Sequence, residues 1–397
     1  MNSATTSAGL SPGTVHGGAA HGLRAQSLAR GAAGIALLHV ERARRGTGSW
    51  AEAHTMLASC VNGLIADEDA SLYFGAPAVA FALHTASLGT GRYTKALHTL
   101  DAQIDQLTRR RIAAAHARID RGERPRLGEF DLFYGLTGLG SYLLCRDPNG
   151  ETLRDVLTYL VRITWPLEGD AEQLPGWWTE FDPSGSLSRD FPGGHGNLGM
   201  AHGVSGILSL LAIAARRGTV VDGQIAAMKR ICTHLDDHRQ DTGTGGWWPQ
   251  WVTLGEHRTQ TLAQKGPARP SWCYGTPGLV SAQRLAALAL GDTARQRMAE
   301  QALLSCLADP AQLARIRDAG ICHGAAGLLH TARRIAQETA EPGFEEHLPH
   351  LYALLQKQEP ADEDGFLDGR AGRELAAMAY ETESSTATGW DACLLSG

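Results

Sequence analysis

Apolar residues along the chain are grouped into stretches of helical length, and these stretches are of two kinds. The first kind is apolar nearly all round, as between Gly206 and Arg217, where isoleucine and leucine side chains leave no polar face. Such a segment is typical of a buried helix. The second kind is amphipathic and predicts an outer helix. Segments of the second kind cover residues 51–64, 93–118, 151–164, 221–237, 294–307 and 345–357.

A repeated pair of small residues introduces the buried stretches. The seven pairs are Gly31 and Gly34, Gly75 and Ala78, Gly135 and Gly138, Gly203 and Gly206, Gly275 and Gly278, Gly324 and Gly327, and Gly369 and Gly372. Because glycine inside a helix costs about 1 kcal/mol relative to alanine, we expect these pairs at helix starts, where they allow backbones to approach closely. Buried and amphipathic helices in alternation, with almost no period-two pattern, predict an all-α fold. Seven stacked helical hairpins could curve into a solenoid or close into a ring.

Two parts of the chain fall outside the repeat. Residues 1–23 are rich in Ser, Thr, Gly and Ala and are predicted to form a flexible tail, which leaves residues 24–397 as a single domain. The connections at 165–197 and 238–271 are long, and together they hold six of the nine tryptophans. Long aromatic loops in a compact domain either recognise a ligand, here as a peptide-binding rim, or pack over the ring. The sequence leaves both interpretations open.

Composition and charge narrow the class of protein. In 397 residues, 43% are hydrophobic, which is enough for a sizeable core. A net charge of -6 with 20% charged residues gives no basic surface for nucleic acid. Neither a signal peptide nor an apolar run of about 20 residues is visible, so a cytoplasmic location is expected. The seven widely spaced cysteines are an odd number and predict reduced thiols or metal ligands rather than a disulfide framework.

Candidate metal ligands stand directly before two of the glycine pairs. Cys273 and Tyr274 precede Gly275, while Cys322 and His323 precede Gly324. Although a lone buried cysteine is usually an apolar filler, two cysteines at equivalent repeat positions favour a metal site. Two thiolates and one imidazole suit zinc, and three protein ligands leave a fourth position open, as in catalytic sites. In a closed ring these residues would converge on a central cavity.

An acid–base pair is predicted beside this set. His202 occupies the same repeat position as His323, which favours the cavity over a purely structural role. Asp131, four residues before Gly135, either partners His202 or caps its own helix. Arg269 could supply a fixed positive charge.

The glycine-rich segment 193–199 contains His195. It imitates a phosphate-binding loop, but neither a lysine nor a preceding strand accompanies it, so we discount that function. The sequence leaves the role of His195 open.

These motifs resemble the lanthionine synthetase C-like family, the cyclases that form thioether rings in lantibiotics. The resemblance runs from about residue 24 to the end, and its motifs are Trp272-Cys273-Tyr274-Gly275-x-Pro277-Gly278, Cys322-His323-Gly324-x-x-Gly327, Asn197-Leu-Gly-Met-Ala-His202-Gly203-x-x-Gly206 and Trp390-Asp391-Ala-Cys393-Leu-Leu395. It implies an α/α toroid of about seven inner and seven outer helices with one zinc ion in the central cavity. By motif position it implies Cys273, Cys322 and His323 as zinc ligands, and Asp131, His202, Arg269 and Tyr274 as residues of the site. The chain departs from the pattern at Ala78, Arg370 and Arg373, which affects two hairpins but not the metal motifs.

The function implied by the resemblance is that of a stand-alone lanthipeptide cyclase. Such an enzyme adds cysteine thiols of a dehydrated precursor peptide to dehydroalanine or dehydrobutyrine, which gives lanthionine or methyllanthionine rings. His202 is expected to transfer the proton, with Asp131 orienting it and Arg269 countering enolate charge. The implied partners are the dehydrated precursor with its leader, a separate dehydratase and an exporter, which would bring the protein, expected to be a monomer, to the inner face of the membrane.

Three alternatives remain at this point. The first is addition of glutathione or another thiol to dehydrated proteins at the same site. The second is a zinc-dependent protein prenyltransferase-like subunit, which would need several Arg or Lys residues in the cavity, where the glycine-flanked positions offer little beyond Arg269. The third is a non-catalytic helical-repeat binding module whose metal is structural, and whose unfolding should follow metal removal.

Overall fold

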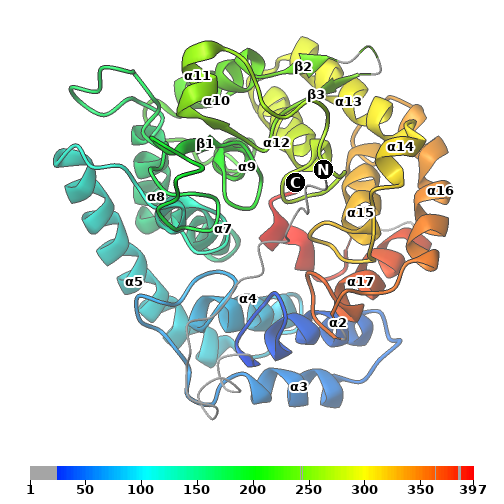
Figure 1. Cartoon of the computed structure of the whole chain (residues 1–397). Coiled ribbons are helices and arrows are strands. Elements are labelled where there is room, and N and C mark those ends of the chain that lie inside the picture. Colours follow the sequence, from blue (N-terminus) through cyan, green and yellow to red (C-terminus); the bar gives the residue numbers. More distant parts are fainter. Residues whose placement is uncertain (1–24, 242, 244, 363, 383–385) are drawn as a thin grey trace.

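The seven glycine-led stretches each form a helix, and these helices make a closed inner ring (Figure 1). The computed structural model describes residues 25–241, 243, 245–362, 364–382 and 386–397, so the tail predicted at 1–23 lies outside the described residues. The inner helices are α2 (Ala32–Arg44), α4 (Ala76–Ser87), α7 (Leu136–Arg146), α9 (Val204–Arg216), α12 (Thr276–Leu290), α15 (Ala325–Ala336) and α17 (Arg370–Glu381). Each contacts the next along the chain, and α17 contacts α2. The hairpins therefore close into a ring, not a solenoid.

The outer layer consists of the amphipathic helices. They are α3 (Trp50–Ser59), α5 (Thr94–Asp120), α8 (Glu151–Arg162), α10 (Gln224–Asp237), α13 (Thr293–Leu307) and α16 (Gly343–Lys357). Each of the six predicted outer segments overlaps one of these helices, and each helix packs on the inner helix that precedes it. The part of the chain that the structure describes thus holds seven inner and six outer helices. Within these same residues, no helix is long and apolar enough to cross a lipid bilayer.

The long connections carry the short elements. They include β1 (His195–Asn197), which pairs antiparallel with β4 (Trp251–Thr253), and β2 (Gln240–Asp241), which pairs with β3 (Gly246–Trp247). The remaining short elements are α6 (Leu127–Phe130), α11 (Leu254–Thr259), α14 (Pro310–Leu313) and the 3-10 helix η1 (Trp390–Leu394). Because β1 and β4 come from different connections, their pairing ties the two long loops together.

The burial of the loop tryptophans shows which of them pack over the ring and which could contact a ligand. Four are nearly fully buried, and these are Trp177, Trp178, Trp247 and Trp248. Trp165 is 56% exposed, and Trp251 is half-buried on the wall of the central cavity. Most of the loop tryptophans therefore pack over the ring, and one remains available to a ligand in the cavity.

The second glycine of the pair fixes the approach to the inner helix at both cysteine motifs. A Cβ on Gly278 would lie 1.9 Å from the carbonyl oxygen of Trp272, and a Cβ on Gly327 would lie 1.9 Å from that of Ile321. Real Cβ atoms do not approach an oxygen so closely, so only glycine lets the preceding segment fold back onto the helix start. The residue after each of these carbonyls is Cys273 or Cys322. The glycine spacing thus sets both cysteines at the same end of the ring.

Residues 386–397 fill the centre of the ring, where they appear in red in Figure 1. Tyr73 donates its hydroxyl hydrogen to the carbonyl of Cys393 at 2.9 Å, and the indole N–H of Trp272 donates to the carbonyl of Leu394 at 3.0 Å. Trp390 is fully buried. These contacts reach the segments before α4 and before α12, so the C-terminal segment joins two separate inner hairpins.

Candidate functional site

A large cavity opens at the end of the ring where the inner helices begin. Its volume is about 2790 Å³. Six of the seven residues that directly precede the first glycine of a pair line it: Arg30, Tyr134, His202, Tyr274, His323 and Asp368. The exception is Phe74, whose Gly75 has a φ of 74° while the other six first glycines are extended. The predicted convergence of the repeat on one cavity is therefore confirmed.

The three predicted metal ligands come together on the wall of this cavity. The donor atoms of Cys273, Cys322 and His323 all lie within 4.8 Å of one another. A backbone hydrogen bond of 3.1 Å from the Cys273 N–H to the Cys322 carbonyl joins the two segments. Two sulfurs and one imidazole nitrogen at this separation fit a tetrahedral zinc ion with one position left for another ligand.

Two carboxylates flank the imidazole of His323. Asp318 Oδ2 lies 3.6 Å from His323 Nε2, and Asp368 Oδ1 lies 3.8 Å from Nδ1. Whichever nitrogen binds a metal, the other has a carboxylate within reach, as is usual for metal-binding histidines. Asp318 also lies 3.9 Å from Arg269 Nη1, and Asp368 pairs with Arg30 at 3.2 Å. Arg269 therefore borders the proposed metal site through Asp318.

Both carboxylates stand at repeat positions that the sequence also marks. Asp368 occupies the repeat position of His323 and Tyr274, and Asp318 precedes Cys322 by the same four residues that separate Arg269 from Cys273. The offset that singled out Arg269 would thus have found Asp318.

The two thiols shift each other's pKa values in opposite directions. A hydrogen bond with Cys322 lowers the pKa of Cys273, and this interaction outweighs burial, which acts in the opposite direction. The same hydrogen bond, added to burial, raises the pKa of Cys322. Burial lowers the pKa of His323, but the hydrogen bond and charge of Cys273 raise it overall. The arrangement therefore favours negative charge on the sulfur of Cys273, and a thiolate is the form that binds a metal.

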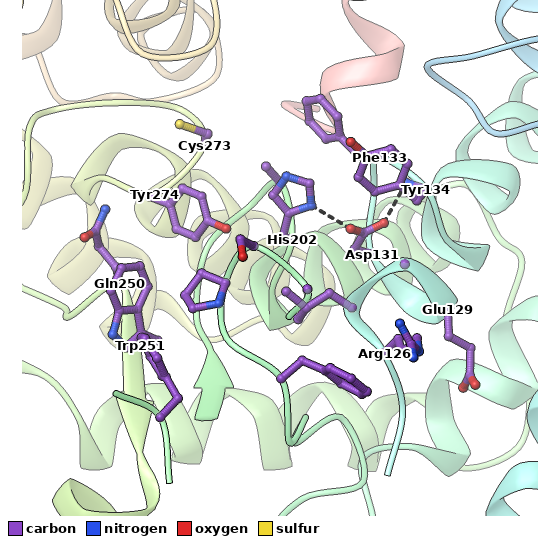
Figure 2. Close-up of a pocket in the computed structure, with 18 of the residues that line it drawn as sticks. Arg126, Glu129, Asp131, Phe133, Tyr134, His202, Gln250, Trp251, Cys273 and Tyr274 are labelled. Carbon is purple, nitrogen blue, oxygen red and sulfur yellow. Dashed lines mark hydrogen bonds and ion pairs between the residues drawn. The ribbon is translucent and has the colours of Figure 1, made fainter. Parts of the chain in front are cut away.

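His202 and Asp131 form the predicted pair. His202 Nδ1 lies 2.6 Å from Asp131 Oδ2, and Asp131 is 1% exposed (Figure 2). The other oxygen, Oδ1, accepts the backbone N–H groups of Tyr134 at 2.6 Å and Gly135 at 2.9 Å. Asp131 thus partners His202 and also holds the turn before α7, but it does not cap that helix, whose N-cap residue is Gly135. Because the carboxylate takes the hydrogen on Nδ1, Nε2 is the nitrogen left to act as a base.

Aromatic rings surround His202. Ring centroids lie 4.9 Å away for Phe133, 5.8 Å for Tyr134 and 6.2 Å for Tyr274. The hydroxyl oxygen of Tyr274 accepts a hydrogen bond of 3.3 Å from the side-chain amide of Asn197. Burial raises the pKa of Tyr274, and raises that of Tyr134 to about 12. Tyr274 was predicted for the site, whereas Tyr134 and Phe133 were not, although Tyr134 stands before a glycine pair.

His195 lies outside this group and is fully buried. It belongs to β1, and its Nδ1 lies 2.8 Å from the carbonyl oxygen of Phe181. Burial lowers the pKa of His195 to about 4, so the ring is neutral at physiological pH. Its segment is a strand packed under the cavity wall.

Comparisons with known proteins agree with this architecture. A family model described as lanthionine synthetase C-like protein matches residues 18–395. The chain is 25% identical over 332 residues to the nisin biosynthesis protein NisC of Lactococcus lactis subsp. lactis, an alignment that covers 82% of this chain and 77% of that protein. The solved structure of a nisin cyclase matches with a TM-score of 0.79 and 21% identity, over 94% of this chain and 93% of that one. The predicted α/α toroid is thereby confirmed as the fold.

Proposed function

The chain belongs to the lanthionine synthetase C-like family, and from this membership we propose that it is a zinc-dependent lanthipeptide cyclase. It would add cysteine thiols of a dehydrated precursor peptide to dehydroalanine or dehydrobutyrine residues of the same peptide. The observation that carries the proposal is the meeting of two groups in one cavity: the Cys273, Cys322 and His323 trio, and the pair of His202 with Asp131. A metal site with an open position beside a general base is what thiol activation and proton transfer require.

Cys273, Cys322 and His323 would hold the zinc ion, since soft sulfur and imidazole donors suit this metal. Bound zinc would lower the pKa of a substrate thiol that takes the fourth ligand position. Asp318 and Asp368 would orient His323 through its ring nitrogens.

The chain's own residues would handle the proton and the developing charge. In the reaction the thiol loses its proton, the sulfur bonds to the β-carbon, and the double bond between the α- and β-carbons opens to give an enolate. The α-carbon then takes up a proton. We assign both proton transfers to His202 Nε2, with Asp131 holding the ring through Nδ1. The proton leaving sulfur thus ends on the α-carbon.

The enolate oxygen needs positive charge near it. Arg269 lines the cavity beside the proposed metal site, and we assign it this role. The inner helices also begin at the cavity, so the positive ends of their dipoles act in the same direction. Tyr274, with its ring 6.2 Å from that of His202, would bound the reacting groups on one side.

The size of the cavity suits a polypeptide substrate, which both cyclisation and thiol addition to dehydrated proteins require. A volume of about 2790 Å³ exceeds the roughly 300–1,000 Å³ of ordinary small-molecule sites.

The cavity does contain several arginines that the glycine-flanked positions could not reveal, since they come from α5 and the loop after it. Arg118 pairs with Glu129 at 2.7 Å and Arg124 pairs with Asp170 at 2.7 Å. Because these guanidinium groups already have acidic partners, they do not favour a diphosphate pocket.

The direct test is co-expression of a dehydrated precursor with this protein, followed by thiol alkylation and mass spectrometry. Cyclisation leaves the peptide mass unchanged and removes alkylatable thiols. The Cys273→Ala and Cys322→Ala variants should leave the thiols in place, whereas Cys306→Ala, in a buried cysteine of α13, should behave as the parent protein. If every thiol of the cognate precursor stays alkylatable with the parent protein, the cyclase function is refuted.

The partners and location remain part of this proposal. We expect a separate dehydratase to supply the substrate, because the dehydro residues must be formed in the precursor before a thiol can add to them. A cytoplasmic monomer that meets an exporter at the membrane is the expected setting, and size-exclusion chromatography with co-purification would test it.

A further inference from the structure

We propose that Tyr274, Trp251 and Phe191 form a subsite that binds apolar side chains of the precursor peptide next to the reacting residues. We call these three residues the aromatic subsite. The proposal rests on the cyclase function above and adds the class of peptide that the cavity would select. It also gives a role to Trp251 and His195, which that function did not use.

The aromatic subsite is a row of rings that leads away from the catalytic residues. The ring of Tyr274 lies 6.2 Å from that of His202 and 6.3 Å from that of Trp251, and the ring of Phe191 lies 5.8 Å from that of Trp251. All three side chains are half-buried and line the cavity. Figure 2 shows Tyr274 between His202 and Trp251. When a peptide reacts at His202, the residues next to the reacting ones therefore lie either against these rings or against the opposite wall of the cavity.

Residues of β1 contact the three rings of the aromatic subsite and hold them in place. Trp251 lies directly opposite Asn197 in the β1–β4 pair, and Asn197 donates to the hydroxyl of Tyr274. The buried ring of His195 lies 5.3 Å from Phe191 and 6.3 Å from Trp251. Because His195 is neutral, it supports the two rings without bringing charge to the wall. A supported aromatic surface needs little reorganisation to bind an apolar group.

The spacing of the rings fits an extended peptide. Side chains two residues apart in an extended chain point to the same side and lie roughly 6.6 Å apart. The separations of 6.3 Å and 5.8 Å along the aromatic subsite are close to this repeat. Alternate side chains of the peptide could thus rest on Trp251 and on Phe191, while the residue between them points away.

The opposite side of the cavity has a different chemistry. Beyond His202, Glu129 and Arg126 lie on the far side from Trp251 (Figure 2). Glu129 is paired with Arg118, and the guanidinium of Arg126 covers the ring of Phe181 at 4.3 Å. Selection by apolar contact therefore belongs to the aromatic subsite. Glutathione has no apolar side chain that could use it.

The test is a binding measurement with unreactive peptides and the zinc-loaded full chain. Each fluorescent peptide keeps its cysteine and carries alanine in place of the dehydro residue. One peptide has phenylalanine at the second and fourth positions before the cysteine, one has it at the same positions after the cysteine, and one has alanine throughout. We expect one phenylalanine peptide to bind about tenfold more tightly than the alanine peptide by fluorescence anisotropy.

The variants separate the aromatic subsite from general damage. Trp251→Ala and Phe191→Ala should bring the affinity ratio close to one, and Trp251→Phe, which keeps a ring, should retain most of it. Trp165→Ala should keep the full ratio, because this exposed residue lies outside the cavity lining. Equal affinities in the parent protein, or an unchanged ratio in both alanine variants, would overturn the proposal.

Binding and cyclisation are read separately in this design. A peptide preference without loss of thiols from a reactive precursor would leave the aromatic subsite standing and refute the cyclase function. Loss of thiols without any preference would do the reverse.

Discussion

Replacing Asp131 with asparagine should uncouple the two tasks of this carboxylate. Asp131 Oδ1 accepts two backbone N–H groups, and Oδ2 lies 2.6 Å from His202 Nδ1. The asparagine oxygen can still accept the backbone groups, but its NH₂ cannot accept the hydrogen on Nδ1. The imidazole would then carry its hydrogen on Nε2 and lose the base that faces the reaction.

The magnitudes follow from these contacts. Loss of a positioned general base costs about 100- to 10,000-fold in rate, so the Asp131→Asn variant should cyclise at least about 100-fold more slowly. Its stability should fall by only about 1–2 kcal/mol, because the backbone groups stay paired. Asp131→Ala should be slow as well, and it should also lose about 2–6 kcal/mol, because two buried N–H groups lose their acceptor at about 1–3 kcal/mol each.

The assay combines urea unfolding, zinc content and the initial rate of thiol loss from a precursor. Zinc content should remain at the parent level in Asp131→Asn, because Asp131 is not one of the three residues of the trio. Asp101→Asn is a matched control, since Asp101 is also an ion-paired aspartate, with Arg146 at 2.7 Å, but lies outside the cavity lining. An Asp131→Asn variant that cyclises within a few-fold of the parent rate would refute the assignment of His202 and Asp131 as the acid–base pair.

Three further predictions follow from the same structure. Chelation of zinc should abolish cyclisation while the helical circular-dichroism signal persists, and unfolding on chelation would instead indicate a structural metal. Because burial lowers the pKa of His195 from 6.5 to about 4, the unfolded chain takes up this proton first. His195 therefore contributes stability that is full above about pH 6.5 and falls by about 1.4 kcal/mol per pH unit toward about pH 4. In urea unfolding, the stability of His195→Gln should fall less steeply between pH 7 and 5 than that of the parent protein. An equal slope in the two proteins would contradict the argument. Gly278→Ala, whose new Cβ would meet the Trp272 carbonyl, should reduce stability and zinc content together, whereas Gly255→Ala, at a position with open space around it, should leave both unchanged.

The periodic part of this fold could be predicted from the sequence because periodicity encodes burial. The stretch after Gly206 is apolar on every side, and in the structure it is an inner helix buried along nearly its whole length. Periodicity alone left both a solenoid and a ring open, because closure depends on contact between α17 and α2, at opposite ends of the repeat, and only the family resemblance implied the closed toroid. Each hairpin contacts only its neighbours, so its sequence carries no local signal for the total rotation that builds up over seven hairpins.

The residues of the site also fall into two groups, those that could be predicted from the repeat and those that could not. Cys273, Cys322 and His202 stand at fixed positions in the repeat, so convergence of the inner helices brings them together. Trp251 and His195 lie in irregular loops, where neither glycine spacing nor hydrophobic period gives a position. Their contact depends on the pairing of β1 with β4, two strands of three residues each in separate connections. Such short strands leave almost no pattern in a sequence.

The segment that fills the centre of the ring has a consequence for how the chain folds. The hydrogen bonds from Tyr73 to Cys393 and from Trp272 to Leu394 join residues 320 and 122 positions apart. During synthesis the first hairpins therefore cannot make these contacts until residues 386–397 have left the ribosome, and their inner faces stay uncovered until then. Contacts of such long sequence separation slow folding and expose apolar surface to other molecules in the meantime. Chaperone demand in this protein should accordingly be greatest just before the last hairpin is complete.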